Sequence, residues 1–139
     1  MTSAIAAIDA CVEDLIAAFE PPPRQTVSEW ADQNRRLSSE ASAEPGQWRT
    51  DRAPYQRAIL DALTPNSPYE RVVMMAASQT GKTEVALCFV GYIIDRDPGP
   101  MLVVLPRVED GESWSKDRLA PMLRHTPCLN GKVADVRSR

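Results

Sequence analysis

A stretch of eight residues near the middle of the chain has the residue types and spacing of a phosphate-binding loop. It reads Ala76-Ala77-Ser78-Gln79-Thr80-Gly81-Lys82-Thr83, and it departs from the pattern G-x-x-x-x-G-K-[ST] only at the first position, where alanine stands. Gly81 lets the backbone approach a ligand closely, so that N–H groups converge on a polyphosphate. Lys82 offers a compact positive charge to the β- and γ-phosphates, and the Thr83 hydroxyl offers a ligand to Mg²⁺.

A loop of this kind needs a buried strand before it and a helix after it, and the flanking sequence predicts both. Residues 72–76 form a continuous apolar run typical of a strand that is buried on both faces. The apolar positions between Val85 and Ile94 predict a helix that continues to about Asp95. This context favours a phosphate loop over the alternative, which is a surface turn with a solvated lysine.

Two further features agree with a nucleotide site. Tyr55 and Gln56 lie on a helix predicted to begin at Pro54. In helicase-like ATPases a glutamine placed upstream of the loop reads the adenine edge, with an aromatic neighbour stacking on the ring. The alternative for Gln56 is an ordinary surface residue. A second buried strand is predicted over 101–105, and its Pro106 ending resembles the motif that follows the loop helix in helicase-type motors.

The acidic half of an ATPase site is not predicted. Hydrolysis needs an acid at the end of an apolar strand to hold Mg²⁺ and a group that positions the attacking water. The strand over 101–105 is followed by proline, with no acid. Asp95 and Asp97 are predicted to end a helix, and Glu109, Asp110 and Glu112 are predicted to form a solvated helix start favoured by the helix dipole. We therefore expect no Walker B residue in this chain.

The segment before the loop is predicted to be largely helical. An apolar stripe predicts a helix over 3–19, which either packs on its own domain or docks on another subunit. Thr26 and Glu29 fit a capping box for a short helix from Val27 to about Arg36, with Trp30 turned inward. A long loop is predicted over 37–53.

Beyond the second strand the pattern weakens. A helix is predicted over about 109–124, with Pro121 either kinking or ending it. Residues 132–136 are a weak candidate for a third strand.

Composition bounds the class of protein. The chain has 139 residues, of which 43% are hydrophobic and 25% charged, and these are globular values that exclude a disordered or fibrous chain. The net charge of −3 gives no overall basic field for nucleic acid. Three cysteines without a CxxC pair indicate a reducing, intracellular setting. No signal peptide and no membrane span are predicted, so we expect a cytoplasmic protein.

In order and spacing, residues 27–125 resemble the large terminase subunit of tailed phages, in the lambda-type GpA group. The segments that carry the resemblance are Val27-Ser28-Glu29-Trp30-Ala31-Asp32, Gly46-Gln47-Trp48-Arg49-Thr50, Pro54-Tyr55-Gln56, Val73-Met74-Met75-Ala76 continuing through the loop to Glu84, Asp97-Pro98-Gly99-Pro100, Val103-Val104-Leu105-Pro106 and Ser115-Lys116-Asp117-Arg118-Leu119-Ala120-Pro121-Met122. Members of the group often have a basic residue where Ala76 stands.

The resemblance implies an α/β fold: a P-loop NTPase core of the helicase-like motor type with parallel strands, preceded by an N-terminal helical segment. Residues 1–25 would form the amphipathic helix and proline linker, and residues 26–139 the N-terminal part of the ATPase domain. The sheet is expected to be incomplete, because only two clear strands are predicted where a parallel sheet has about four to six. A truncated reading frame, a prophage remnant or an excised fragment would each fit.

The resemblance also implies a function and a site. It implies a motor ATPase that packages double-stranded DNA into procapsids and an endonuclease, working with the terminase small subunit and the procapsid portal in the bacterial host cytoplasm. ATP and Mg²⁺ are the implied cofactors, with Lys82 as the catalytic residue and Thr83 as the metal ligand. The implied nucleotide contacts are Tyr55, Gln56, Ser78, Gln79, Thr80, Gly81, Lys82 and Thr83. This chain is expected to bind ATP without hydrolysing it alone.

Two alternatives remain open from the sequence. The first is a fragment of another helicase-like P-loop ATPase, which downstream acidic motifs would separate from a terminase. The second is a non-catalytic interaction remnant that binds a partner through the helix over 3–19 and keeps only a vestigial loop. Comparing nucleotide binding with that of Lys82→Ala addresses the second alternative.

Overall fold

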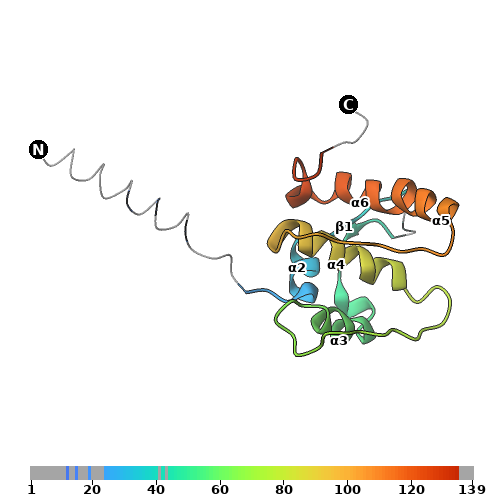
Figure 1. Cartoon of the computed structure of the whole chain (residues 1–139), viewed down its shortest axis with the longest axis horizontal. Helices are drawn as coiled ribbons and strands as arrows, with labels where there is room; N and C mark the ends of the chain where they lie inside the picture. The colour runs from blue at the N-terminus through green and yellow to red at the C-terminus, as the bar shows by residue number, and fades with distance from the viewer. Residues whose placement is uncertain are drawn as a thin grey trace, which may run out of the picture.

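Short helices and one two-stranded hairpin make up the part of the chain that the computed structural model describes, namely residues 24–40, 42 and 44–134, together with 12, 15 and 19 (Figure 1). The helix predicted over 3–19 therefore lies almost wholly outside the described residues. The elements are α2 (Val27–Asn34), β1 (Arg36–Leu37), β2 (Gly46–Gln47), η1 (Thr50–Arg52), α3 (Tyr55–Ala62), α4 (Lys82–Arg96), α5 (Val108–Ser113), η2 (Trp114–Leu119), α6 (Ala120–His125) and η3 (Pro127–Leu129).

Helix α2 begins with the capping box that the sequence predicts. The Thr26 side chain accepts a hydrogen bond from the Glu29 N–H at 3.2 Å, and the Thr26 N–H donates to Glu29 Oε2 at 2.9 Å. Two donors that a helix start leaves without partners are thereby satisfied. The helix ends at Asn34, slightly before the predicted end, and Trp30 is fully buried as expected.

The loop predicted over 37–53 contains regular structure that the sequence did not predict. Strand β1 pairs antiparallel with β2, with Arg36 opposite Gln47, and the 3₁₀ turn η1 follows. A backbone bond from Trp48 N to Arg35 O, at 2.9 Å, extends the hairpin toward α2. Strands of two residues are too short for an alternating pattern, so the sequence carries no periodic signal for them.

The core lies among α2, α3 and α4, which contact one another. Trp30 from α2, Leu60 from α3, and Leu87 and Cys88 from α4 are buried there, and Leu129 from η3 joins them. Burial raises the pKa of the Cys88 thiol to about 12, so Cys88 is a small apolar core residue, as its sequence neighbours indicate.

The helix predicted over 109–124 is present as three consecutive helical pieces, α5, η2 and α6. The middle piece, η2, is π-helical, and Pro121 follows it within the first turn of α6. A proline has no N–H to donate to the preceding turn, and a local widening of the helix is a common way to accommodate it. Pro121 thus begins a new helical piece rather than ending the run. Residues 132–134, the described part of the predicted third strand, form a turn and a bend instead.

The prediction of two strands buried on both faces is wrong for the described residues. Segments 72–76 and 101–105 do not form strands, and the hairpin β1–β2 is the one sheet among the residues described. Exposure alternates along both segments, as it does along any extended chain with one covered face. Val73 is 81% exposed and Met75 98%, while Leu102 is 85% and Val104 78%.

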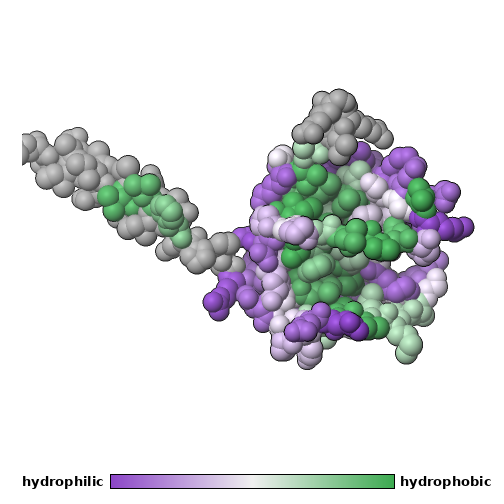
Figure 2. Space-filling view, in the orientation of Figure 1, coloured by the Kyte–Doolittle hydropathy of each residue, from purple (hydrophilic) through white to green (hydrophobic). Residues whose placement is uncertain are grey.

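The physical reason is the lack of neighbouring strands. A parallel sheet is stable when its strands pair and helices cover both of its faces. Among the described residues no strand pairs with either apolar segment, and one row of side chains on each segment stays exposed. Figure 2 shows the resulting apolar surface on the face where the segment over 101–105 crosses in front of α4.

Candidate phosphate-binding site

The loop over 76–83 leads directly into α4, as predicted. Gly81 is the N-cap of α4 and has φ +79°, a left-handed conformation that favours glycine. Gln79 also has a positive φ, +59°. No side chain caps the start of α4, so the N–H groups of its first turn are left for a ligand or water. Together with the helix dipole, these groups favour an anion at this position.

Lys82 lies over the loop that precedes it. Its Nζ donates to the Ala76 carbonyl at 3.2 Å and also to the Ala77 carbonyl. Thr80 Oγ1 donates to the same Ala77 carbonyl at 2.9 Å, which closes the loop on itself. Ala76 therefore takes part through its backbone, a role that does not depend on the residue type at this first position.

Helix α3 holds the loop from the other side. The Gln56 Nε2 donates to the Thr80 carbonyl at 3.0 Å, and the Tyr55 hydroxyl donates to the same oxygen at 3.1 Å. Gln56 is only 4% exposed, whereas Tyr55 is 59% exposed. The structure thus brings both residues to the loop. The adenine contact expected of them stays a prediction.

The remaining predicted site residues lie on the open side of the loop. Ser78 and Gln79 form an exposed turn, and Thr83 is exposed on the first turn of α4. Thr83 directly follows Lys82 and is accessible from solvent.

A partly buried ion pair next to the loop was not predicted. Arg35 is 2% exposed, and its Nη2 lies 2.9 Å from Glu84 Oε2 on the first turn of α4. The pair ties α4 to the segment between α2 and β1, so it fixes the helix that carries Lys82. In the sequence, the acid directly after Gly81-Lys82-Thr83 was the available signal, but nothing marked Arg35 as its partner.

The acids near the second apolar segment lie at helix ends, as expected. Asp95 is near the end of α4, and its Oδ2 accepts a hydrogen bond from Trp30 Nε1 at 2.8 Å. At the start of α5, Asp110 pairs with Arg107, with 3.2 Å between the Arg107 Nε and Asp110 Oδ2. Within residues 24–40, 42 and 44–134, no group of three or more His, Cys, Asp or Glu side chains gathers as a metal site.

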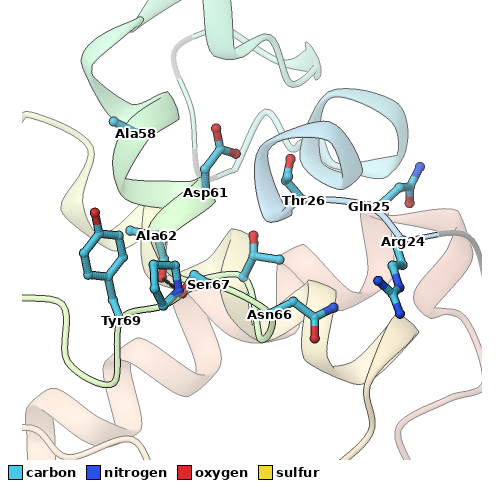
Figure 3. A pocket seen from close by; sticks show the side chains of 11 residues that line it. Arg24, Gln25, Thr26, Ala58, Asp61, Ala62, Asn66, Ser67 and Tyr69 are labelled. Carbon is cyan, nitrogen blue, oxygen red and sulfur yellow. Dashed lines mark hydrogen bonds between the residues drawn. The ribbon is translucent and has the colours of Figure 1, made fainter.

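A cavity of ≈ 420 Å³ lies away from the loop, between the start of α2, α3 and the segment that follows α3 (Figure 3). Arg24, Thr26, Asp61 and Tyr69 are among its lining residues. None of residues 76–83 lines it, so this cavity is separate from the predicted phosphate site.

In the described part of the chain, no helix is long and apolar enough to cross a membrane.

Comparison with protein-family models matches residues 42–139 to the phage terminase large subunit gpA, ATPase domain. No curated protein and no solved structure was found to match the chain. The matched range covers more than half of the sequence and includes Tyr55, Gln56 and the whole loop over 76–83. By this match the chain belongs to the family of phage terminase large subunit gpA ATPase domains.

Proposed function

We propose that this chain binds the polyphosphate of ATP on the loop over 76–83, as part of the ATPase of a DNA-packaging terminase. The observation that carries the proposal is the uncapped start of α4, with Gly81 in a left-handed conformation and Lys82 lying over the loop. Backbone N–H groups, a helix N-terminus and a lysine are the groups that bind phosphate in such loops.

The residues present fit such a ligand. A Cβ at position 81 would stand 2.4 Å from Gln56 Nε2, so only glycine leaves this wall of the loop undisturbed. Without phosphate, the Lys82 ammonium bonds to the carbonyls of Ala76 and Ala77, and a phosphate would replace these partners with stronger charged ones. When bound, Mg²⁺ neutralises developing charge on the phosphates, and Thr83 is the residue that we assign to it.

The finer activities follow from the family. We propose that the complete terminase packages double-stranded DNA and cuts it, acting with its small subunit and the procapsid portal in the host cytoplasm. The segments over 72–76 and 101–105 are then positions for parallel strands of a P-loop sheet. The open apolar row on each segment, which includes Val73 and Leu102, supports this proposal, because sheet neighbours would bury it.

Isothermal titration calorimetry of the chain with Mg-ATP measures the affinity and so tests the binding proposal. Lys82→Ala should weaken binding about 10- to 100-fold, because hydrogen bonds to charged groups contribute about 1.5–3 kcal/mol. The matched control is Lys116→Ala in η2, whose ammonium pairs with Glu112 on an exposed surface. Equal affinity of the parent chain and Lys82→Ala would contradict the proposal, whereas Lys116→Ala should bind like the parent.

A further inference from the structure

The peptide between Thr80 and Gly81 is held by two side chains from α3. Its carbonyl oxygen accepts from Gln56 Nε2 at 3.0 Å and from the Tyr55 hydroxyl at 3.1 Å. A carbonyl oxygen has two lone pairs, so both donors are accommodated at once. These bonds fix the direction in which this peptide carbonyl points, which is toward α3.

The orientation of the carbonyl decides the orientation of the next N–H group. A trans peptide is planar, and its C=O and N–H point in opposite directions. With the Thr80 carbonyl drawn toward α3, the Gly81 N–H points away from α3. It therefore joins the N–H groups of the first turn of α4, which no side chain caps.

Gln56 is also fitted to Gly81 by shape. A Cβ on residue 81 would come within 2.4 Å of Gln56 Nε2 and 3.6 Å of Gln56 Cδ, so the carboxamide occupies the space that a side chain there would need. The position of the Gln56 carboxamide therefore requires glycine at position 81. A change at either residue would alter the contact between them.

The buried amide carries a cost that packing alone does not explain. Gln56 Oε1 is buried and has no hydrogen-bond partner among the described residues. A leucine of similar size would leave no such orphan acceptor. Because Oε1 is covered, it is also not open to a nucleobase in this conformation. What the amide does here is donate to the loop.

We infer that Gln56 and Tyr55 are positioning residues for the phosphate loop: they aim the Gly81 N–H at the bound polyphosphate by holding the Thr80 carbonyl. The inference rests on the proposed function of the loop and deepens it. It assigns to this pair a contribution to polyphosphate binding that does not depend on the base, while the exposed ring of Tyr55 stays free to stack on one.

The test compares three ligands on the full chain: Mg-ATP, Mg-GTP and inorganic tripolyphosphate with Mg²⁺. Gln56→Leu removes the donor at similar volume, and Tyr55→Phe removes only the hydroxyl. We expect Gln56→Leu to weaken all three ligands by a similar factor of about ten, and the double variant to weaken them further. Gln47→Leu is the matched control, since Gln47 Nε2 also donates to a backbone carbonyl, that of Asp32, but on β2.

A spectroscopic measurement without ligand separates positioning from general loss of structure. The Gly81 amide resonance should shift in Gln56→Leu and Tyr55→Phe, while the resonance of Gly91, farther along α4, should stay in place. The midpoint temperature of thermal unfolding of Gln56→Leu should be no lower than that of the parent chain, because the buried acceptor without a partner is removed.

The outcomes distinguish this inference from the proposed function. Weaker ATP binding by Gln56→Leu with unchanged GTP and tripolyphosphate would overturn positioning in favour of adenine reading, and unchanged binding of all three would overturn it outright. If the parent chain shows no Lys82-dependent binding, the proposed function itself fails. Parent binding that depends on Lys82 but not on Gln56 leaves that function standing and removes only the inference.

Discussion

Asp95 is the residue at which three separate parts of the chain meet. Its carboxylate accepts from Trp30 Nε1 in α2 at 2.8 Å and from Lys132 Nζ beyond η3, and Arg96 lies beside it. Burial, the largest single influence, raises the pKa of Asp95, but the hydrogen bonds from Lys132 and Trp30 and the nearby positive charges outweigh it. The pKa therefore lies below its ordinary value. Asp95 is thus a structural acid.

Asp95→Asn should lower the free energy of unfolding by about 1–3 kcal/mol at pH 7, because the ion pair with Lys132 is lost and the hydrogen bond from Trp30 no longer goes to a charged carboxylate. Because the folded-state pKa is the lower one, this stabilisation is complete above the ordinary pKa and is lost as the pH falls through the folded value. The difference between parent and variant should therefore shrink below about pH 4.

Urea unfolding at pH 7 and at pH 3 measures both effects. Asp97→Asn is the control, because Asp97 is the exposed C-cap residue of the same helix. Its effect should stay within about 0.5 kcal/mol. A difference between parent and Asp95→Asn that is the same at both pH values would show that the charge of Asp95 is not what stabilises the fold.

At the scale of elements, the contact between α2 and α4 fixes the position of α4, the helix that begins with Lys82. Gly91 of α4 faces Trp30 of α2, and the Trp30 and Tyr92 rings meet edge to face with centroids 6.3 Å apart. A Cβ on Gly91 would stand 2.5 Å from Trp30 Cη2. The glycine inside this helix is therefore explained by close packing, not by a break in the helix.

Gly91→Ala tests the α2–α4 contact. Alanine favours a helix over glycine by about 1 kcal/mol, but overpacking against the fully buried indole should reverse the sign and destabilise the chain by about 1–3 kcal/mol. The matched control is Gly111→Ala in α5, where a Cβ meets nothing within 4 Å. That variant should gain stability, as chemical denaturation would show. Stabilisation by both substitutions would mean that α2 does not lie against Gly91 as described.

At the scale of the whole molecule, the apolar segments over 72–76 and 101–105 differ from the strands of a parallel sheet, because one face of each segment is exposed. Met74 packs against the core while its neighbour Met75 is 98% exposed, so the segment before the loop has one covered face and one open face. A strand buried on both faces would cover both side chains.

A matched pair of substitutions distinguishes the two situations. Met74→Ser should cost about 1–2 kcal/mol of unfolding free energy through lost burial, whereas Met75→Ser should change it by less than about 0.5 kcal/mol. Urea denaturation of both variants measures the contrast. Similar losses at the two positions would mean that the segment is covered on both sides in solution.

The sequence by itself determined what depends on local patterns. The capping box at Thr26 and the helix after the loop each follow from neighbouring residue types, because caps and helical periodicity are decided within a few residues. The order and spacing of several segments over 27–125 likewise indicated the family that the comparison then found.

The tertiary structure decided what depends on residues far apart in the chain. It paired Arg35 with Glu84, gave Asp95 its partners, and turned Gln56 toward the Thr80 carbonyl, none of which leaves a periodic trace in the sequence. It also left segments 72–76 and 101–105 unpaired, although their apolar runs are typical of strands. A strand forms only when it pairs with a neighbouring strand. A run of apolar residues favours the extended conformation but does not supply that neighbouring strand.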